Sequence, residues 1–278
     1  MISAHSGRAG ASLDGWDDAP RPARRCRVIA HRGGAAEVPE NTWSAVEHVS
    51  QLGLEWMETD VRATRDGVVV LAHDPDLART AGDPRAIADL TWEELAGLDA
   101  GDGRAPVRLD EVLDAHPDLC LNVDLKESAV VQGAIQVVRA ADAFERVRFA
   151  SFSGRRLAVL RRQEPRARTS LGVSDVAGLM VSAETGFGLP RTRWSWSRDR
   201  SRTDAVQVPV AYHGVPVVTE RFVAASHRAG LEVHVWTVDD PAEMRRLVAM
   251  RVDAVVTDVP SLAMEVLGRR RQAGPEVV

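Results

Sequence analysis

The sequence has few cysteines, and none of them is spaced for a metal–thiolate site. Cys26 and Cys120 are the two cysteines among 278 residues, and each lies in an apolar stretch that predicts a strand. A structural zinc site needs several closely spaced cysteine or histidine ligands, so the pattern excludes a cysteine-based site of this kind. Because isolated cysteines in apolar surroundings are usually buried thiols, we expect both to be free rather than joined in a disulfide.

The sequence also lacks an excess of positive charge. Its 35 lysines and arginines are outnumbered by 40 aspartates and glutamates, which leaves a formal net charge of −5. Proteins that bind duplex DNA or RNA usually carry a basic surface, so we expect no nucleic-acid partner. Short arginine runs such as residues 269–271 are typical of solvated surface.

Long apolar runs are absent as well. No segment reaches the roughly 18 consecutive apolar residues that indicate a transmembrane helix. Residues 1–25 lack the apolar core of a signal peptide and show no periodic pattern, which predicts a flexible leader. These features predict a cytoplasmic protein without stable membrane insertion. The sequence gives no indication of the oligomeric state.

What the sequence does contain is a regular alternation of short apolar runs with longer amphipathic stretches. This alternation predicts parallel strands joined by right-handed crossovers. Eight strand-like runs occur, at residues 28–30, 56–63, 119–125, 147–151, 169–173, 205–208, 232–238 and 254–257. Eight such units favour an α/β fold of the closed TIM (β/α)8 barrel type, although periodicity alone also allows an open sheet. The barrel domain would span residues 26–265, with a flexible tail at 266–278.

The segment that follows the second strand departs from this alternation. Residues 65–67 read Arg-Asp-Gly and predict a tight turn into a further apolar run at 68–72. Residues 74–106 are less regular, although Thr91 and Glu94 form the capping-box pattern of a short helix. We therefore expect a small insertion after the second strand, near the mouth of the active site.

Carboxylates stand near the carboxyl ends of two predicted strands, which is where (β/α) barrels carry their active sites. Glu58 and Asp60 are two residues apart on one strand, so both side chains face the same side. Asp124 ends the next core strand. Buried carboxylates repel each other and lose hydration, a cost that a divalent cation offsets. Because oxygen ligands suit hard cations, we expect Glu58, Asp60 and Asp124 to bind one Mg²⁺ or Ca²⁺ ion.

Two histidines and two cations flank these carboxylates. His31 ends the first strand, and His73 follows the run after the tight turn. An imidazole pKa of about 6.5 lets one histidine act as a base while the other acts as an acid near neutral pH. Arg32 and Lys126 are suited to hold a phosphoryl group. His234, which shares a strand face with Trp236, is a weaker candidate for a wall of the site.

Taken together, these motifs resemble the glycerophosphodiester phosphodiesterase family over about residues 27 to 262. The matching segments are His31-Arg32-Gly33-Gly34, Pro39-Glu40-Asn41-Thr42, Glu58-Thr59-Asp60-Val61, Asp66-Gly67, His73-Asp74-Pro75, Leu90-Thr91, Glu94-Leu95, Leu109-Asp110-Glu111-Val112-Leu113, Ser151-Phe152, Val235-Trp236-Thr237-Val238 and Thr257-Asp258. The resemblance implies a (β/α)8 barrel that hydrolyses glycerophosphodiesters to sn-glycerol 3-phosphate and an alcohol. The expected partner is therefore a small-molecule diester.

The resemblance assigns roles that agree with those expected from the residues themselves. It implies His31 and His73 as the acid/base pair, with Glu58, Asp60 and Asp124 as metal ligands. Arg32 and Lys126 would hold phosphate, and Trp236 would line the substrate pocket. Glu40 and Asn41 would support the site through hydrogen bonds.

The chain departs from the family pattern at two positions. Asp124 replaces the usual glutamate of the third-strand motif and is one methylene shorter, so its contact with a metal could be direct or through water. Asp239 stands where the family often has asparagine, which bears on substrate preference rather than on the reaction.

Two alternative functions stay open at this stage. One is a related barrel phosphodiesterase of the lysophospholipase D or sphingomyelinase D type, with an apolar docking surface at Trp194-Ser195-Trp196. The other is a barrel that binds phosphate-containing ligands without turnover, which the intact histidine pair argues against.

Overall fold

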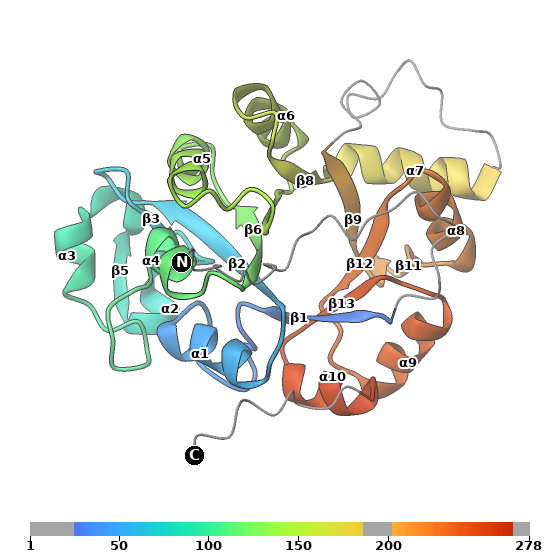
Figure 1. Cartoon of the computed structure of the whole chain (residues 1–278), viewed down its shortest axis with the longest axis horizontal. Helices are drawn as coiled ribbons and strands as arrows, with labels where there is room; N and C mark the ends of the chain where they lie inside the picture. Colours follow the sequence, from blue (N-terminus) through green and yellow to red (C-terminus); the bar gives the residue numbers. More distant parts are fainter. Residues whose placement is uncertain (1–24, 186–201, 269–278) are drawn as a thin grey trace, which may run out of the picture.

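Eight parallel strands close into a barrel in the computed structural model of the chain (Figure 1), which describes residues 25–185 and 202–268. The barrel strands are β1 (Arg27–His31), β2 (Trp56–Ala63), β6 (Cys120–Leu125), β7 (Val147–Ala150), β8 (Arg168–Ser170), β9 (Thr203–Pro209), β12 (Glu232–Trp236) and β13 (Ala254–Thr257). Each pairs in parallel with its neighbours, and β1 lies between β2 and β13. This double pairing of β1 closes the sheet and confirms the predicted (β/α)8 barrel.

Continuous apolar runs in the strands explain why the sheet is closed and covered on both faces. Every residue of β2 except Arg62 is buried, and every residue of β6 is buried. Strands buried on both faces are typical of parallel sheets that have helices outside and packed side chains inside. The polar residues that interrupt these runs therefore stand out, since each must find a partner or face a cavity.

Helices cover the outside of the barrel, and most begin at a residue whose side chain caps the first turn. They are α1 (Trp43–Gln51), α5 (Val130–Ala140), α6 (Gly154–Gln163), α7 (Val173–Thr185), α8 (Glu220–Arg228), α9 (Pro241–Ala249) and α10 (Pro260–Val266). Thr42, Ser153, Thr219 and Asp240 accept hydrogen bonds from backbone amides at the starts of α1, α6, α8 and α9. Within the described residues, no helix is both long enough and apolar enough to span a bilayer.

The insertion after the second strand is present as expected. Gly67 takes a left-handed conformation at φ 85° and turns β2 into β3 (Val69–Leu71), which pairs antiparallel with it. The remaining elements are β4 (Asp76–Leu77), α2 (Ala78–Ala81), β5 (Asp83–Ala86), η1 (Ile87–Asp89), α3 (Trp92–Ala96) and α4 (Leu109–Ala115). Thr91 and Glu94 form the capping box predicted for α3.

The structure corrects the sequence prediction at the fifth barrel strand. The prediction extended this strand to residue 173, but β8 ends at Ser170 and helix α7 begins at Val173. The chain turns at Gly172, which packs against Gly154 so closely that a Cβ atom on Gly172 would lie 2.7 Å from the Gly154 Cα. Helices α7 and α10, and the short hairpin of β10 (Ala211–Tyr212) and β11 (Val215–Pro216), were not predicted.

Several sequence expectations fall outside the described residues. These are the leader at 1–24, the tryptophan-containing segment with Trp194 and Trp196, and the tail from 269 onward. The two cysteines do lie within the described part of the chain, where both are buried and free as expected.

A network of buried charges fills the amino end of the barrel interior. It consists of Arg27, Arg148, Asp204, Glu232 and His234, and is called the amino-end network below. Glu232 pairs with Arg27 and lies 2.9 Å from His234 Nε2, while Arg148 Nε donates to Asp204 at 2.8 Å. Burial opposes ionisation of Glu232, but the hydrogen bond from His234 and the two arginines lower its pKa to about 2. His234 is fully buried in this network and does not line the active-site cavity.

Candidate active site

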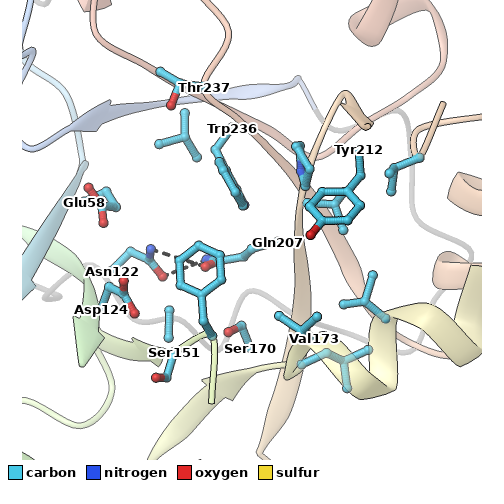
Figure 2. Close-up of a pocket in the computed structure, with 18 of the residues that line it drawn as sticks. Glu58, Asn122, Asp124, Ser151, Ser170, Val173, Gln207, Tyr212, Trp236 and Thr237 are labelled. Carbon is cyan, nitrogen blue, oxygen red and sulfur yellow. Dashed lines mark hydrogen bonds between the residues drawn. The ribbon is translucent and has the colours of Figure 1, made fainter. Parts of the chain in front are cut away.

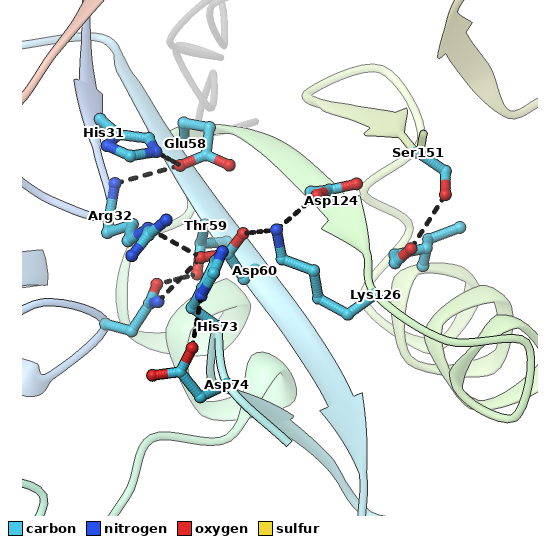
Figure 3. A network of polar contacts seen from close by, with 12 residues as sticks. His31, Arg32, Glu58, Thr59, Asp60, His73, Asp74, Asp124, Lys126 and Ser151 are labelled. Atoms are coloured by element: carbon cyan, nitrogen blue, oxygen red, sulfur yellow. Dashed lines mark hydrogen bonds and ion pairs between the residues drawn. The ribbon is translucent and has the colours of Figure 1, made fainter. Parts of the chain in front are cut away.

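The residues singled out in the sequence converge on one cavity of about 700 Å³ at the carboxyl ends of the barrel strands. Those that line it are His31, Arg32, Glu58, Asp60, His73, Asp124, Lys126 and Trp236. Glu40 and Asn41 lie outside the lining and contact it from behind through hydrogen bonds. Strands β1, β2 and β6, the residues that directly follow β1 and β6, and the loop after β3 therefore supply these charged groups in one place (Figure 3).

Strand register brings Asp60 and Asp124 side by side. The two residues are direct partners in the pairing of β2 with β6, and Lys126 Nζ lies 2.7 Å from a carboxylate oxygen of each. Arg32 Nε lies 3.1 Å from the second oxygen of Asp60. Burial by itself would raise the pKa of Asp60, but Lys126 and Arg32 outweigh it and lower that pKa below the usual value.

Glu58 and Asp124 are less well compensated than Asp60. Burial and the neighbouring Asp60 charge raise the pKa of Glu58 to about 8. Its Oε2 accepts a hydrogen bond from the Arg32 backbone at 3.1 Å. Burial also raises the pKa of Asp124 in spite of Lys126, and among the described residues its buried Oδ1 has no hydrogen-bond partner. The site thus holds more carboxylate than its own cations neutralise.

His31 stands at the end of β1, in register with Glu58. Its Nδ1 contacts Asp258 Oδ1 at 2.6 Å, and its Nε2 lies 3.8 Å from Glu58 Oε2. Burial would lower the pKa of His31, but the Asp258 hydrogen bond and the Glu58 charge together raise it. Asp258 is itself held by Asp239, whose Oδ1 accepts hydrogen bonds from the Asp258 amide and the Thr257 hydroxyl.

His73 lies at the opposite end of the charged cluster (Figure 3), after β3. Its Nδ1 contacts Asp74 Oδ1 at 2.8 Å, and its carbonyl oxygen accepts hydrogen bonds from Arg62 on β2. Arg79 in the insertion donates to Asp74 at 2.7 Å and to Glu40 at 2.6 Å. In both histidines, a carboxylate at Nδ1 fixes the ring and leaves Nε2 available for proton transfer.

The loop after β1 is shaped to bring backbone and side chains close to the carboxylates. Arg32 and Asn41 both have positive φ, at 51° and 56°. Asn41 donates to Asp60 at 3.2 Å and accepts from Thr59 at 2.7 Å, which ties the loop to β2. Only glycine fits at position 33, because a Cβ atom there would lie 2.4 Å from the Cβ of Ala45 in α1.

The donor set is chemically suited to a hard divalent cation. Within residues 25–185 and 202–268, no three His, Cys, Asp or Glu side chains already form a metal-binding group. Lys126 Nζ instead lies between Asp60 and Asp124. Carboxylates that bind a cation lack a full set of protein partners when the ion is absent. The unpartnered Oδ1 of Asp124 and the raised pKa of Glu58 match this, so Glu58, Asp60 and Asp124 fit such an ion.

Several residues of the cavity were missed by sequence reasoning. Asn122 and Gln207 form its floor, where Gln207 Nε2 donates to Asn122 Oδ1 at 2.7 Å (Figure 2). Phe152 meets Trp236 edge to face, with ring centroids 5.7 Å apart. Helix α7 supplies Val173 and Met180 among others. The sequence carried a signal for Phe152 in the Ser151-Phe152 motif, but none that would place Gln207 or α7 at the site.

The sequence is similar to members of one protein family. The model of the glycerophosphoryl diester phosphodiesterase family matches residues 31–262. A Mycobacterium tuberculosis protein named "Probable glycerophosphodiester phosphodiesterase 2" is 36% identical over 86% of this chain and 90% of its own length. A glycerophosphodiester phosphodiesterase of Caldanaerobacter subterraneus is 29% identical over 84% of this chain and 94% of its own.

Solved structures give the same result for the fold. A glycerophosphodiester phosphodiesterase from Thermotoga maritima aligns with a TM-score of 0.68 at 25% identity, covering 87% of this chain and 98% of its own. A phosphodiesterase from Oleispira antarctica, in complex with the product sn-glycerol-3-phosphate, aligns with a TM-score of 0.71 at 23% identity, covering 87% and 96%. At this identity, the second likeness supports the fold alone.

Proposed function

The chain belongs to the glycerophosphoryl diester phosphodiesterase family and is a phosphodiester hydrolase, and from that premise we propose a metal-dependent reaction with His31 and His73 as its acid/base pair. The substrate is a glycerophosphodiester, and the products are sn-glycerol 3-phosphate and an alcohol. The observation that carries the proposal is the placement of two histidines, each fixed at Nδ1 by a carboxylate, on one cavity with three further carboxylates and two cations.

In this reaction, the side chains of the cavity bind and orient the diester. Arg32 and Lys126 face the cavity with their positive charges and would hold the phosphate oxygens. Glu58, Asp60 and Asp124 would bind the divalent cation, Mg²⁺ or Ca²⁺. When bound, that ion supplies charge neutralisation to the phosphoryl group. Trp236 would contact the substrate next to the phosphate.

The two histidines divide the proton transfers. One takes a proton from the nucleophile, and the other gives a proton to the alkoxide that leaves phosphorus. The nucleophile is either water or the glycerol hydroxyl next to the ester, and the second route forms a cyclic phosphodiester before hydrolysis. Detection of the cyclic product in a single-turnover reaction separates the two routes. Asp258 and Asp74 act through the histidines, as positioning residues that hold each ring.

The names of similar proteins support the choice of substrate. Relatives that match most of this chain are named glycerophosphodiester phosphodiesterases. The Oleispira antarctica enzyme was solved with sn-glycerol-3-phosphate, which is the product proposed here. The cytoplasmic location and a role in lipid or glycerol metabolism stay predictions from the sequence.

The experiment that tests the proposal is an assay of glycerol 3-phosphate release from glycerophosphocholine, glycerophosphoethanolamine and glycerophosphoglycerol. Each substrate is supplied with Mg²⁺, Ca²⁺ or a chelator. We expect turnover with at least one ion and its loss on chelation. Metal binding without turnover of any diester would instead indicate a barrel that binds phosphate ligands without catalysis.

A further inference from the structure

A layer of uncharged polar side chains lies between the amino-end network and the charged groups of the active site. Asn122 precedes Asp124 by two residues on β6, so both side chains point to the same face of the strand. His234 stands in the same relation to Trp236 on β12, and Gln207 on β9 is the register partner of His234. Two residues of a strand span roughly 6–7 Å, which places Asn122 about that far below Asp124.

A chain of hydrogen bonds leads from the amino-end network to the cavity floor, and it has one consistent direction. With a pKa of about 2, Glu232 is ionised and only accepts, so the His234 Nε2 atom 2.9 Å from it carries the ring proton. Burial lowers the pKa of His234 and keeps the ring neutral, which leaves Nδ1 as an acceptor. The Gln207 amide lies 3.4 Å from this Nδ1 and must therefore present its nitrogen there rather than its oxygen.

The direction of the Gln207 amide in turn sets that of Asn122. Gln207 Nε2 also donates to Asn122 Oδ1 at 2.7 Å, so the Asn122 nitrogen faces the Gln207 oxygen. This second contact measures 3.5 Å, which is longer than the usual N–H···O distance of about 2.7–3.2 Å. The cavity floor therefore presents a donor, Asn122 Nδ2, beside an acceptor, Gln207 Oε1, and the two bond only weakly to each other (Figure 2).

A hydroxyl is the group that satisfies both of these atoms at once. Its oxygen accepts from Asn122 Nδ2 while its proton goes to Gln207 Oε1, whereas an ammonium has no acceptor and a carbonyl has no donor. Asn122 is 3% exposed, and His234 behind Gln207 is fully buried, so a substrate must end at this floor rather than pass through it. Glycerol ends in such a hydroxyl, on the carbon farthest from phosphorus.

We propose that Asn122 and Gln207 bind the terminal hydroxyl of the substrate glycerol. His234 and Glu232 act as positioning residues in this assignment, because they fix the direction of the Gln207 amide. The proposal rests on the phosphodiesterase function described above and deepens it, since it names the residues that distinguish glycerol from an alcohol without the terminal hydroxyl. This hydroxyl is remote from the bond that breaks, so its contacts act mainly on KM rather than on kcat.

The first test compares glycerophosphocholine with its terminal deoxy analogue, which lacks only the hydroxyl farthest from phosphorus. In the wild type, we expect the analogue to have a kcat/KM about tenfold lower, mostly through KM. Gln207→Met is nearly isosteric and removes the acceptor, so it should leave less than about twofold between the two substrates. Gln136→Met makes the same change on the exposed face of α5 and should keep the wild-type ratio.

Two results of this comparison would overturn the assignment. One is equal kcat/KM for the two substrates in the wild type. The other is an undiminished tenfold ratio in Gln207→Met with circular dichroism like that of the wild type, because a side chain with a merely structural role would affect both substrates alike.

The second test addresses the hydrogen-bond chain itself. Nitrogen NMR of protein labelled in its histidine rings reports which nitrogen of His234 carries the proton, and we expect Nε2. In His234→Phe the Gln207 amide loses its fixed direction, so the ratio between the two substrates should fall about threefold while kcat for glycerophosphocholine stays within about twofold of wild type. A proton on Nδ1, or an unchanged ratio in His234→Phe, would refute the positioning role.

Binding measurements separate failure of this assignment from failure of the proposed function. Calorimetric titration with glycerol 3-phosphate, its terminal deoxy analogue and its central deoxy analogue requires no turnover. We expect the terminal analogue to bind about tenfold more weakly than glycerol 3-phosphate in the wild type and equally in Gln207→Met, whereas the central analogue should still bind more weakly to Gln207→Met than to the wild type. This pattern without turnover of any diester would support the assignment and contradict the proposed function. Turnover of glycerophosphocholine with equal binding of all three phosphates would do the reverse.

Discussion

Charged side chains are buried at both ends of the barrel interior, but the carboxylates at the two ends differ in how far neighbouring cations compensate them, and so in their pKa values. In the amino-end network, Glu232 is surrounded by Arg27, Arg148 and His234, and its pKa falls to about 2. At the carboxyl end, Asp60 and Asp124 share Lys126, Glu58 lies 3.8 Å from the His31 ring, and the pKa of Glu58 rises to about 8. In the first cluster the cations keep the carboxylate ionised, whereas the second holds more carboxylate than its cations neutralise and is suited to bind a ligand.

The largest effect is expected from removing either histidine at the carboxyl end. His31→Ala or His73→Ala should lower kcat by about 10²- to 10⁴-fold, because proton transfer to or from the reacting oxygen is lost. His116→Asn, at the end of α4, is the matched control and should keep wild-type kcat. Full activity in either alanine variant with metal bound would contradict the assignment of that histidine as an acid or base.

At the amino end, the corresponding change should affect stability rather than chemistry. Glu232→Gln removes the carboxylate and leaves Arg27 and Arg148 without their shared partner, which we expect to cost about 3–5 kcal/mol in the free energy of unfolding. Urea titration measures this loss. The kcat of the folded fraction should stay within about twofold of wild type, because Glu232 does not line the cavity and reaches it through His234 and Gln207, neither of which has a proposed catalytic role. A large fall in kcat without loss of stability would mean that the two ends are not independent.

The stability that Glu232 contributes should depend on pH in a defined window. Its pKa is lowered from 4.5 to about 2 in the folded protein, so its contribution is fully present above about pH 4.5 and is lost as the pH falls toward 2. The shift corresponds to roughly 3 kcal/mol. The difference in unfolding free energy between wild type and Glu232→Gln should therefore shrink over this range. A difference that stays constant from pH 6 to about pH 2 would show that the carboxylate is not the source.

Metal should stabilise the carboxyl end specifically. At about 100 times its dissociation constant, an ion that binds only the folded state adds about 2.7 kcal/mol, or a rise in Tm of about 5–10 °C for a chain of this size. Differential scanning fluorimetry with Mg²⁺ or Ca²⁺ reads this rise. Asp124→Asn should reduce it, while Asp110→Asn, on the surface of α4, should not. If wild type shows no rise with either ion, the proposed ligand set is wrong.

The smallest effect is expected from Arg79, whose contacts with the site, within the part of the chain that the structure describes, run through Glu40 and Asp74. Arg79→Gln should lower kcat about tenfold with little change in KM, because Asp74 no longer holds the His73 ring firmly. Arg79→Lys keeps the charge but not the two-pronged contact, and should recover part of the loss. Steady-state kinetics of the two variants decides this, and equal kcat in both and in wild type would remove Arg79 from the site.

The charged half of the site could be predicted from the sequence because its residues lie at strand ends. His31, Glu58 and Asp124 follow or interrupt buried apolar runs, and the barrel brings the carboxyl ends of its strands together. The spacing of these residues along the chain was therefore enough to predict that they lie together at the site. The same reasoning found the turn at Gly67 and the start of α3.

The apolar half could not be predicted in this way. Helix α7 mixes strong helix formers with valines, serines, threonine and glycine, which are weak ones, and it packs against α8 and α6, so its position depends on tertiary contacts that no local pattern shows. The pairing of Asn122 with Gln207 joins residues 85 positions apart. The contact of Asp258 with His31 likewise depends on the closure of β13 against β1, which no local pattern encodes.

The cavity lining follows the order of the chain. Every aspartate, glutamate, lysine and arginine that lines it falls between residues 31 and 126, while its apolar side chains all come from residue 150 onward. Chemistry and recognition are thus encoded in separate stretches of one gene. Substitutions after β7 that spare Asp258, which contacts His31, can therefore alter which diester fits while the charged groups stay in place.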